Sequence, residues 1–142
     1  MQGNRSQLDD FIQEYSNGSV SLLSDDDLFK KLSLAGDDCD DFLVAFGERF
    51  NVDMAELRWY FHYEEEGMLT PAAFFFKPPY LRVKRIPITI KLLQEAILSR
   101  KWPIQYPEHV LPKRRWDVIA TYVFFAALLV LITVWFISNK TR

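Results

Sequence analysis

The stretch "LSLAGDDCDDFLVAFGERFNVD", residues 32–53, decides how the chain folds. Its second half repeats apolar residues at three- and four-residue intervals, which predicts an amphipathic helix. The apolar positions are Phe42, Leu43, Phe46 and Phe50. In front of them stands "GDDCDD", residues 36–41, with four carboxylates and the single cysteine of the chain. This hexapeptide raises four alternatives: a metal site, a reactive thiol, a cofactor attachment point or a helix start.

The spacing of the four carboxylates favours the helix start. They are Asp37, Asp38, Asp40 and Asp41. A calcium loop of the EF-hand type needs alternating oxygen ligands, a glycine at its turn and a distal glutamate, whereas here two adjacent pairs have no glycine after them. A thiol at a helix start gains acidity from the helix dipole, but neighbouring carboxylates oppose a second anion. We therefore expect one aspartate to cap the helix, the others to complement its dipole, and Cys39 to pack as a small apolar residue.

The first half of the chain is acidic and the second half is basic. Residues 1–66 hold sixteen Asp and Glu against five Lys and Arg, and residues 67–142 hold three against twelve. The acidic half argues against nucleic-acid binding, because it would repel phosphates. The bases between residues 81 and 102 are better explained by anionic lipid headgroups. They are Arg82, Lys84, Arg85, Lys91, Arg100 and Lys101.

Residues 118–138, "VIATYVFFAALLVLITVWFIS", contain no charge. A helix of about 20 such residues crosses a hydrocarbon core of about 30 Å, so this segment predicts a single membrane span. Trp116, Tyr122 and Trp135 suit the two interfacial aromatic belts. The span also lacks the ionisable residues that mark an ion path, and it therefore predicts an anchor in the lipid bilayer.

The orientation follows from the flanking charges and from the N-terminus. The first twenty residues lack the basic start and apolar core of a secretory signal. Three bases precede the span, Lys113 to Arg115, and two follow it, Lys140 and Arg142. We expect a cytoplasmic N-terminal domain, a single pass, an outside tail at 139–142 and insertion of the tail-anchored type.

The remaining chain predicts a mainly α fold, a small helical domain at 1–102 joined to the span by a Pro-rich basic tether at 103–117. Four helices are expected: one from Ser6 to Tyr15, one capped by Ser24 with Asp27, one after the acidic hexapeptide, and one capped by Thr89. Asp53 with Glu56 forms another capping pair. Prolines interrupt residues 71–87, where we expect an extended chain. A small hairpin through Leu81, Val83 and Ile86 is an alternative for part of this segment.

Residues 40–54, "DDFLVAFGERFNVDM", resemble the second helix of an acyl carrier protein. In that family an Asp-Ser-Leu turn opens the helix, and the serine hydroxyl carries phosphopantetheine. Counted back from Phe50, the position of that serine falls on Gly36, and neither Gly36 nor Cys39 offers a hydroxyl. The nearest serine is Ser33, followed by Leu34, and the resemblance makes Ser33 the alternative cofactor-binding residue.

A second resemblance covers residues 22–102. The motifs are "GDDCDDFL" at 36–43, Phe50 with Val52 and Asp53, Tyr60 with Phe61 and Glu64, and "ITIKLLQEAILSRKW" at 88–102. In this order they resemble the enterobacterial family catalogued as domain of unknown function 1493, which looks like a degenerate acyl-carrier fold. The resemblance implies a fold but no activity, and it does not predict the added membrane helix. Since the family is enterobacterial, we expect the anchor to lie in the bacterial inner membrane.

The sequence assembles no nucleophile with a base and an orienting group, and it contains no phosphate loop and no His-Glu-x-x-His metal motif. We therefore expect no enzymatic activity, no cofactor and no metal. The leading hypothesis is a membrane-anchored acidic adaptor that binds a basic protein partner. Its partner-binding face consists of Asp37, Asp38, Asp40, Asp41 and Glu48. The alternative is a phosphopantetheine-type acyl carrier tethered to the membrane.

Overall fold

The helix predicted from residues 32–53 forms the centre of the fold. In the computed structural model, which describes residues 2–16, 21–66 and 71–140, it is α3, Gly36–Phe50. All four predicted apolar positions of α3 are buried, and Cys39 is buried beside them. The Phe42 ring lies 5.0 Å from that of Phe11 and 5.6 Å from that of Phe29. Aromatic side chains from three helices thus meet on one face of α3, as the apolar spacing predicted.

The helices α1, Gln2–Glu14, and α2, Leu28–Leu32, pack on this face. Their buried residues are the predicted ones: Leu8, Phe11, Ile12, Leu28, Phe29 and Leu32. The predicted starts were wrong. Ser6 lies inside α1 and does not cap it, and α2 begins at Leu28 because Asp27, not Ser24, accepts the Lys30 backbone N–H. Apolar periodicity located the buried face correctly, whereas several polar residues competed for each cap.

The helix α4, Ile90–Ser99, follows its sequence signals closely. The Thr89 hydroxyl accepts the Leu92 backbone N–H at 3.1 Å, which confirms the predicted cap. Arg100 ends the helix with a left-handed backbone, φ 59°. The chain then forms an isolated parallel bridge between Lys101 and Asp53. This bridge joins the end of α4 to the segment that leaves α3.

The described residues contain no β-strand. The hairpin considered through Leu81, Val83 and Ile86 does not form. Three single 3₁₀ turns occupy the chain between α3 and α4 instead: η1, Trp59–Phe61, η2, Pro71–Phe74, and η3, Pro79–Leu81. The prolines around η3 explain this, because each lacks the N–H that a strand ladder requires.

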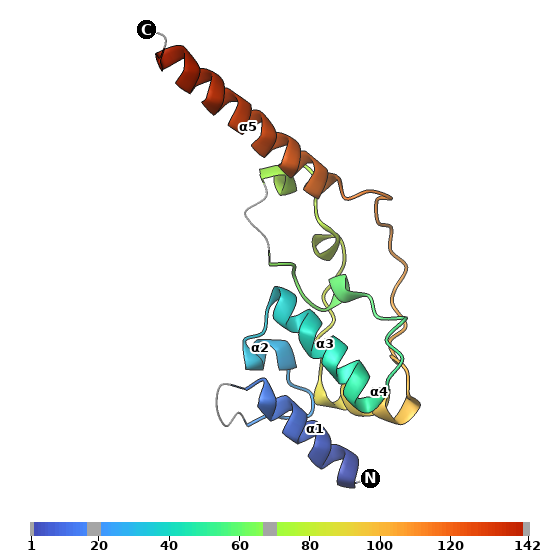
Figure 1. The fold of residues 1–142 in the computed structure, drawn as a ribbon. Helices are drawn as coiled ribbons and strands as arrows, with labels where there is room; N and C mark the ends of the chain where they lie inside the picture. Colours follow the sequence, from blue (N-terminus) through green and yellow to red (C-terminus); the bar gives the residue numbers. More distant parts are fainter. Residues whose placement is uncertain (1, 17–20, 67–70, 141–142) are drawn as a thin grey trace.

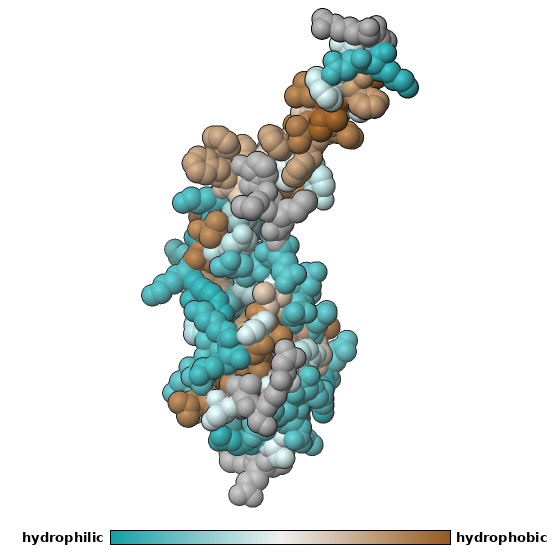
Figure 2. All heavy atoms as spheres, turned by 90° about the vertical axis from the view of Figure 1, so that its left-hand side faces the viewer, coloured by the Kyte–Doolittle hydropathy of each residue, from teal (hydrophilic) through white to brown (hydrophobic). Residues whose placement is uncertain are grey.

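The helix α5, Trp116–Lys140, projects from the domain and contains the whole predicted span (Figure 1). Within the described residues it is the one helix long and apolar enough to cross a membrane. Its 25 residues correspond to about 37 Å at 1.5 Å per residue. Hydrophobic side chains cover the projecting part of α5 in the face shown in Figure 2. The structure confirms a mainly helical fold with one C-terminal helix of membrane-spanning length.

Residues 103–115, most of the predicted tether, run as extended chain along the domain (Figure 1). Ile104 and Tyr106 pack against the hydrophobic core, and Arg115 forms ion pairs beside the start of α5. The segment is therefore attached to the domain at both of its ends.

Candidate functional site

The acidic hexapeptide at 36–41 forms the first turns of α3. Asp37 and Asp38 lie in the first turn, where carboxylates are favoured by the positive end of the helix dipole. The residue before the helix is Ala35, which offers no capping side chain, so the expectation that an aspartate caps α3 was wrong. The predicted carboxylates beside the positive end of the helix dipole are therefore present, whereas the predicted aspartate cap is not.

Gly36 begins α3 with a left-handed φ of 49°. A Cβ at this position would lie 2.0 Å from the Cγ atom of Glu66. Both the backbone and the Glu66 side chain therefore disfavour any other residue here. The resemblance to acyl carrier proteins placed their modified serine at Gly36. The left-handed backbone and the close Glu66 side chain explain why this position holds a glycine.

Three carboxylates of the predicted partner-binding face form a stripe on α3. At about 100° per residue, Asp37, Asp41 and Glu48 fall within about 40° of one another and lie opposite the buried side of the helix. All three side chains are exposed. Val44, half exposed, lies within the same stripe and was not predicted to contribute. We call Asp37, Asp41, Val44 and Glu48 the acidic stripe.

The two other predicted acids differ from the stripe. Asp40 accepts a hydrogen bond from the hydroxyl of the nearly buried Tyr63 at 2.9 Å, so it links α3 to the chain that follows η1. Asp38 is exposed on the flank of the helix. In the part of the chain that the structure describes, no ion pair involves Asp38 or a carboxylate of the stripe. Their charges are left to solvent, ions or a partner.

Cys39 is fully buried on the opposite side of α3. Burial raises the pKa of its thiol to about 12; the nearby Arg85 opposes the shift, and the carboxylates of Asp38 and Glu66 add to it. The thiol therefore stays protonated at neutral pH and packs as a small apolar side chain, as expected. In the described residues, no group of three or more His, Cys, Asp or Glu side chains could hold a metal ion.

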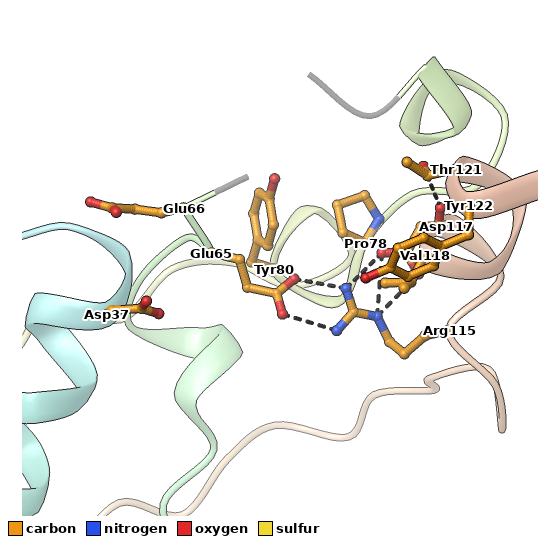
Figure 3. A pocket seen from close by; sticks show the side chains of 10 residues that line it. All are labelled: Asp37, Glu65, Glu66, Pro78, Tyr80, Arg115, Asp117, Val118, Thr121 and Tyr122. Atoms are coloured by element: carbon orange, nitrogen blue, oxygen red, sulfur yellow. Dashed lines mark hydrogen bonds and ion pairs between the residues drawn. The ribbon is translucent and has the colours of Figure 1, made fainter. Parts of the chain in front are cut away.

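A pocket lies between the N-terminal end of α3 and the start of α5 (Figure 3). Arg115 divides its guanidinium between two carboxylates there: Nη1 and Nη2 donate to Glu65 at 3.0 and 2.7 Å, and Nε and Nη2 donate to Asp117 at 3.0 and 2.7 Å. These hydrogen bonds raise the pKa of Arg115 above its ordinary value. Tyr80 and Asp37 line the same pocket. The acidic end of α3 is thus the end that lies nearer to α5.

A partly buried polar network, which the sequence did not indicate, attaches the tether to the domain. Tyr106 Oη accepts hydrogen bonds from the Trp102 indole at 2.7 Å and from the Arg58 backbone N–H at 3.2 Å. Both of its lone pairs are then occupied, so its proton is donated to His62 Nε2, 2.7 Å away. His62 Nδ1–H donates in turn to the Ile86 carbonyl at 2.9 Å.

The network defines the state of His62. Its side chain is 0% exposed, and burial lowers its pKa to about 4. The ring is therefore neutral at pH 7, with both nitrogens occupied. Its role in this fold is to hold Tyr106 and Ile86 together.

Ser33, the alternative cofactor-binding residue, ends α2 with a left-handed backbone, φ 57°. Its side chain is exposed, and it lines a shallow hollow with Tyr15, Asp38 and Asp41. It precedes the first residue of α3 by three positions and lies outside that helix. The structure therefore places Ser33 close to the acidic end of α3 but not at the start of the helix.

Comparison with known families matches residues 5–104 to "Protein of unknown function (DUF1493)". Comparisons with curated proteins and with solved structures give no match. The matched region begins in α1 and ends after Trp102, so it covers the packed helical domain, while α5 lies beyond it. It is wider than the 22–102 region that carried the sequence resemblance. The chain belongs to the DUF1493 family.

Proposed function

We propose that this protein is a membrane-anchored, non-catalytic adaptor that presents the acidic stripe of α3 to a basic protein partner at the membrane surface. The observation that carries the proposal is the position of the stripe. Its carboxylates are exposed and without a described ion pair, and they lie on the helix whose first residues face the start of α5.

The anchoring part of the proposal is supported by α5. The helix combines sufficient length and mean hydropathy for a span with almost no burial against the rest of the chain. A soluble domain would leave an apolar surface of this size open to water at a large free-energy cost, at about 25 cal/mol per Å². A lipid bilayer removes that cost.

The basic character of the partner follows from the position of the acids. A stripe held near an anionic membrane surface repels headgroups, and it attracts the cationic segment of a protein that is itself concentrated there. Val44 adds an apolar contact within the stripe. A complementary partner would therefore carry Lys or Arg around one apolar side chain.

The non-catalytic part is supported by the burial of the single cysteine and of one of the two histidines. Cys39 is buried and protonated, and His62 is buried with both ring nitrogens hydrogen-bonded. Neither can approach a substrate without local unfolding.

Site-specific photo-crosslinking in intact cells tests the adaptor hypothesis. A photoreactive residue replaces Val44 in the stripe, and a matched control replaces Leu98, which is exposed on α4. We expect a specific adduct with a basic protein from position 44 alone, and its loss when Asp37, Asp41 and Glu48 are changed to lysine. Equal adducts from both positions, or an adduct insensitive to charge reversal, would contradict the hypothesis.

The bases considered for lipid headgroups are separated in the structure. Arg85 binds Asp27, and Arg100 donates to the Phe50 carbonyl at 2.6 Å. The helix α4, which begins just before Lys91, lies at the end of the domain remote from α5 (Figure 1). Arg82 and Lys84 stay exposed in the segment that returns from η3, and they are the members of the set best placed for a membrane surface.

For localisation we propose the bacterial inner membrane with a cytoplasmic domain. The support is the bias of three bases before the span against two after it, together with the resemblance to an enterobacterial family. A protease added to spheroplasts should leave the domain intact and should digest it only after the cells are lysed. Digestion in intact spheroplasts would reverse the proposed topology.

The alternative function is an acyl carrier modified on Ser33, for which the exposed hydroxyl and the neighbouring carboxylates are the support. Intact-mass spectrometry of protein co-expressed with a phosphopantetheinyl transferase distinguishes the two functions. A phosphopantetheine-sized increment that is absent from Ser33→Ala would establish the carrier, and an unmodified mass would favour the adaptor.

A further inference from the structure

Three consecutive phenylalanines form the most exposed apolar group of the helical domain. Phe74 and Phe75 are 88% and 80% exposed, and Phe76 is 41% exposed. The rings of Phe74 and Phe75 lie 5.5 Å apart in an edge-on arrangement. Single exposed apolar residues need no explanation, but a contiguous group at the surface marks an interaction site. We call Phe74, Phe75 and Phe76 the Phe finger.

The Phe finger lies beside the start of α5. The turn η2, which ends at Phe74, packs against α5, and the buried positions of that helix are Asp117 and Thr121. Figure 2 shows hydrophobic side chains gathered next to the base of the projecting helix. The Phe finger is thus continuous with the apolar surface of α5.

The length of α5 determines the height of the Phe finger relative to a membrane. Residues 122–137 of α5 are exposed and carry no charge, and they provide about 24 Å of helix. A hydrocarbon core of about 30 Å needs about four residues more. Ser138, Asn139 and Lys140 are polar, so these residues must come from 118–121, the level at which η2 packs.

We propose that the Phe finger inserts into the same membrane leaflet as the start of α5 and gives the domain a second lipid contact. The inference rests on the proposed membrane anchoring. Phe74 and Phe75 would meet lipid tails near the glycerol level, where aromatic rings are favoured. Lys77 follows at once, and Arg82 Nε donates to the Lys77 carbonyl at 2.8 Å, so two exposed cations lie where anionic headgroups begin.

A second contact changes what the anchor does. One helix leaves the domain free to tilt and to rotate about the helix axis, whereas a helix with an inserted turn defines one tilt and one rotation about that axis. The Arg115 ion pairs with Glu65 and Asp117 lie in the same junction and connect it to the domain (Figure 3). The acidic stripe would then be held at a constant height and angle relative to the membrane surface.

The test measures lipid exposure at single positions of the full-length protein in vesicles of phosphatidylcholine and phosphatidylglycerol. Cysteine replaces Phe74 or Phe75, and an environment-sensitive fluorophore is attached at pH 7. The native Cys39 is buried and stays unlabelled, which a mass spectrum of the conjugate verifies. Quenchers are lipids with a nitroxide near the headgroup, lipids with a nitroxide near the tail end, and aqueous iodide.

Two control positions are labelled in the same way. Leu129, exposed in the middle of α5, reports whether the helix spans the bilayer, and Leu23, exposed in the domain, reports a water-facing site. We expect blue-shifted emission and quenching by the shallow nitroxide at 74 and 75, quenching by the deep nitroxide at 129, and quenching by iodide at 23.

Two outcomes overturn the inference in distinguishable ways. Iodide quenching at 74 and 75 together with deep-nitroxide quenching at 129 would remove the second contact and leave the anchor in place. Absence of lipid quenching at 129 would refute the anchor, and the inserted Phe finger with it.

Discussion

Removing the Tyr106 hydroxyl should destabilise the domain although the aromatic ring stays in place. In Tyr106→Phe the ring still packs against Phe61, whose centroid is 4.7 Å away, so no cavity opens. The variant leaves His62 Nε2, the Trp102 indole N–H and the Arg58 backbone N–H without their partner. Each buried unpaired group costs about 1–3 kcal/mol, and the Arg58 amide lies near enough to the surface to find water. The two remaining groups, His62 Nε2 and the Trp102 indole N–H, give an expected loss of about 2–6 kcal/mol.

The structure supplies a matched control for this substitution. The Tyr60 hydroxyl also lies 2.7 Å from a histidine nitrogen, Nε2 of His109, but that hydrogen bond is exposed. Water replaces the partner there, so Tyr60→Phe should cost less than about 1 kcal/mol. Both variants are measured as full-length protein in detergent at pH 7.5, by guanidinium unfolding followed by tryptophan fluorescence. Equal losses in the two variants would refute the buried network as the attachment of the tether.

Three further predictions concern His62, Asp27 and Cys39. His62 has a pKa of about 4 in the folded protein and an ordinary value of 6.5 when unfolded, so between these values the unfolded chain binds a proton and the folded chain does not. The free energy of unfolding should therefore fall by about 3 kcal/mol between pH 6.5 and 4. In His62→Gln this part of the plot of stability against pH should be flatter. Asp27 caps α2 and binds Arg85; burial opposes the shift, but the Arg85 hydrogen bond lowers the Asp27 pKa, so Asp27→Asn should cost about 1–2 kcal/mol in thermal unfolding at pH 7, and its difference from the wild type should shrink as the pH falls below the ordinary value of 3.8. Cys39 should resist N-ethylmaleimide at pH 7.5 in the folded protein and react fully in denaturant, as read from the intact mass; rapid labelling of the folded protein would show that the thiol is accessible.

The helices α1 to α4 could be predicted from the sequence because each has a periodic apolar face, whereas α5 could be predicted from its long uncharged apolar run. Phe11, Phe29 and Phe42 each belong to an apolar face that covers one side of a helix. All three are buried, as the spacing of apolar residues in each helix predicts. Helix starts were less predictable. Ser24 and Asp27 are both good caps, and Asp27 gains an ion pair with Arg85, a residue that is distant in sequence.

The acidic stripe could be predicted in part, because helical geometry alone brings Asp37, Asp41 and Glu48 to one side. Whether a given acid is free could not be predicted. Asp40 is bound by Tyr63, and that contact exists only once the chain after η1 has folded back on α3. The His62 network is hidden for the same reason: its members are brought together by tertiary packing, and no motif spacing indicates them.

The attachment of residues 103–117 bears on how an adaptor of this kind would present its surface. A flexible linker of this length has a root-mean-square span of about 20 Å and would let the acidic stripe sample many heights above the membrane. Here Tyr106 and His109 are hydrogen-bonded to the domain and Arg115 is paired with Glu65, so the tether is held at several points along its length. The entropy cost of ordering the tether is then part of folding and not of partner binding. This favours affinity for a partner at one height and orientation. A fixed presentation also excludes basic proteins that cannot reach that height, so the same contacts that hold the tether would contribute to selectivity.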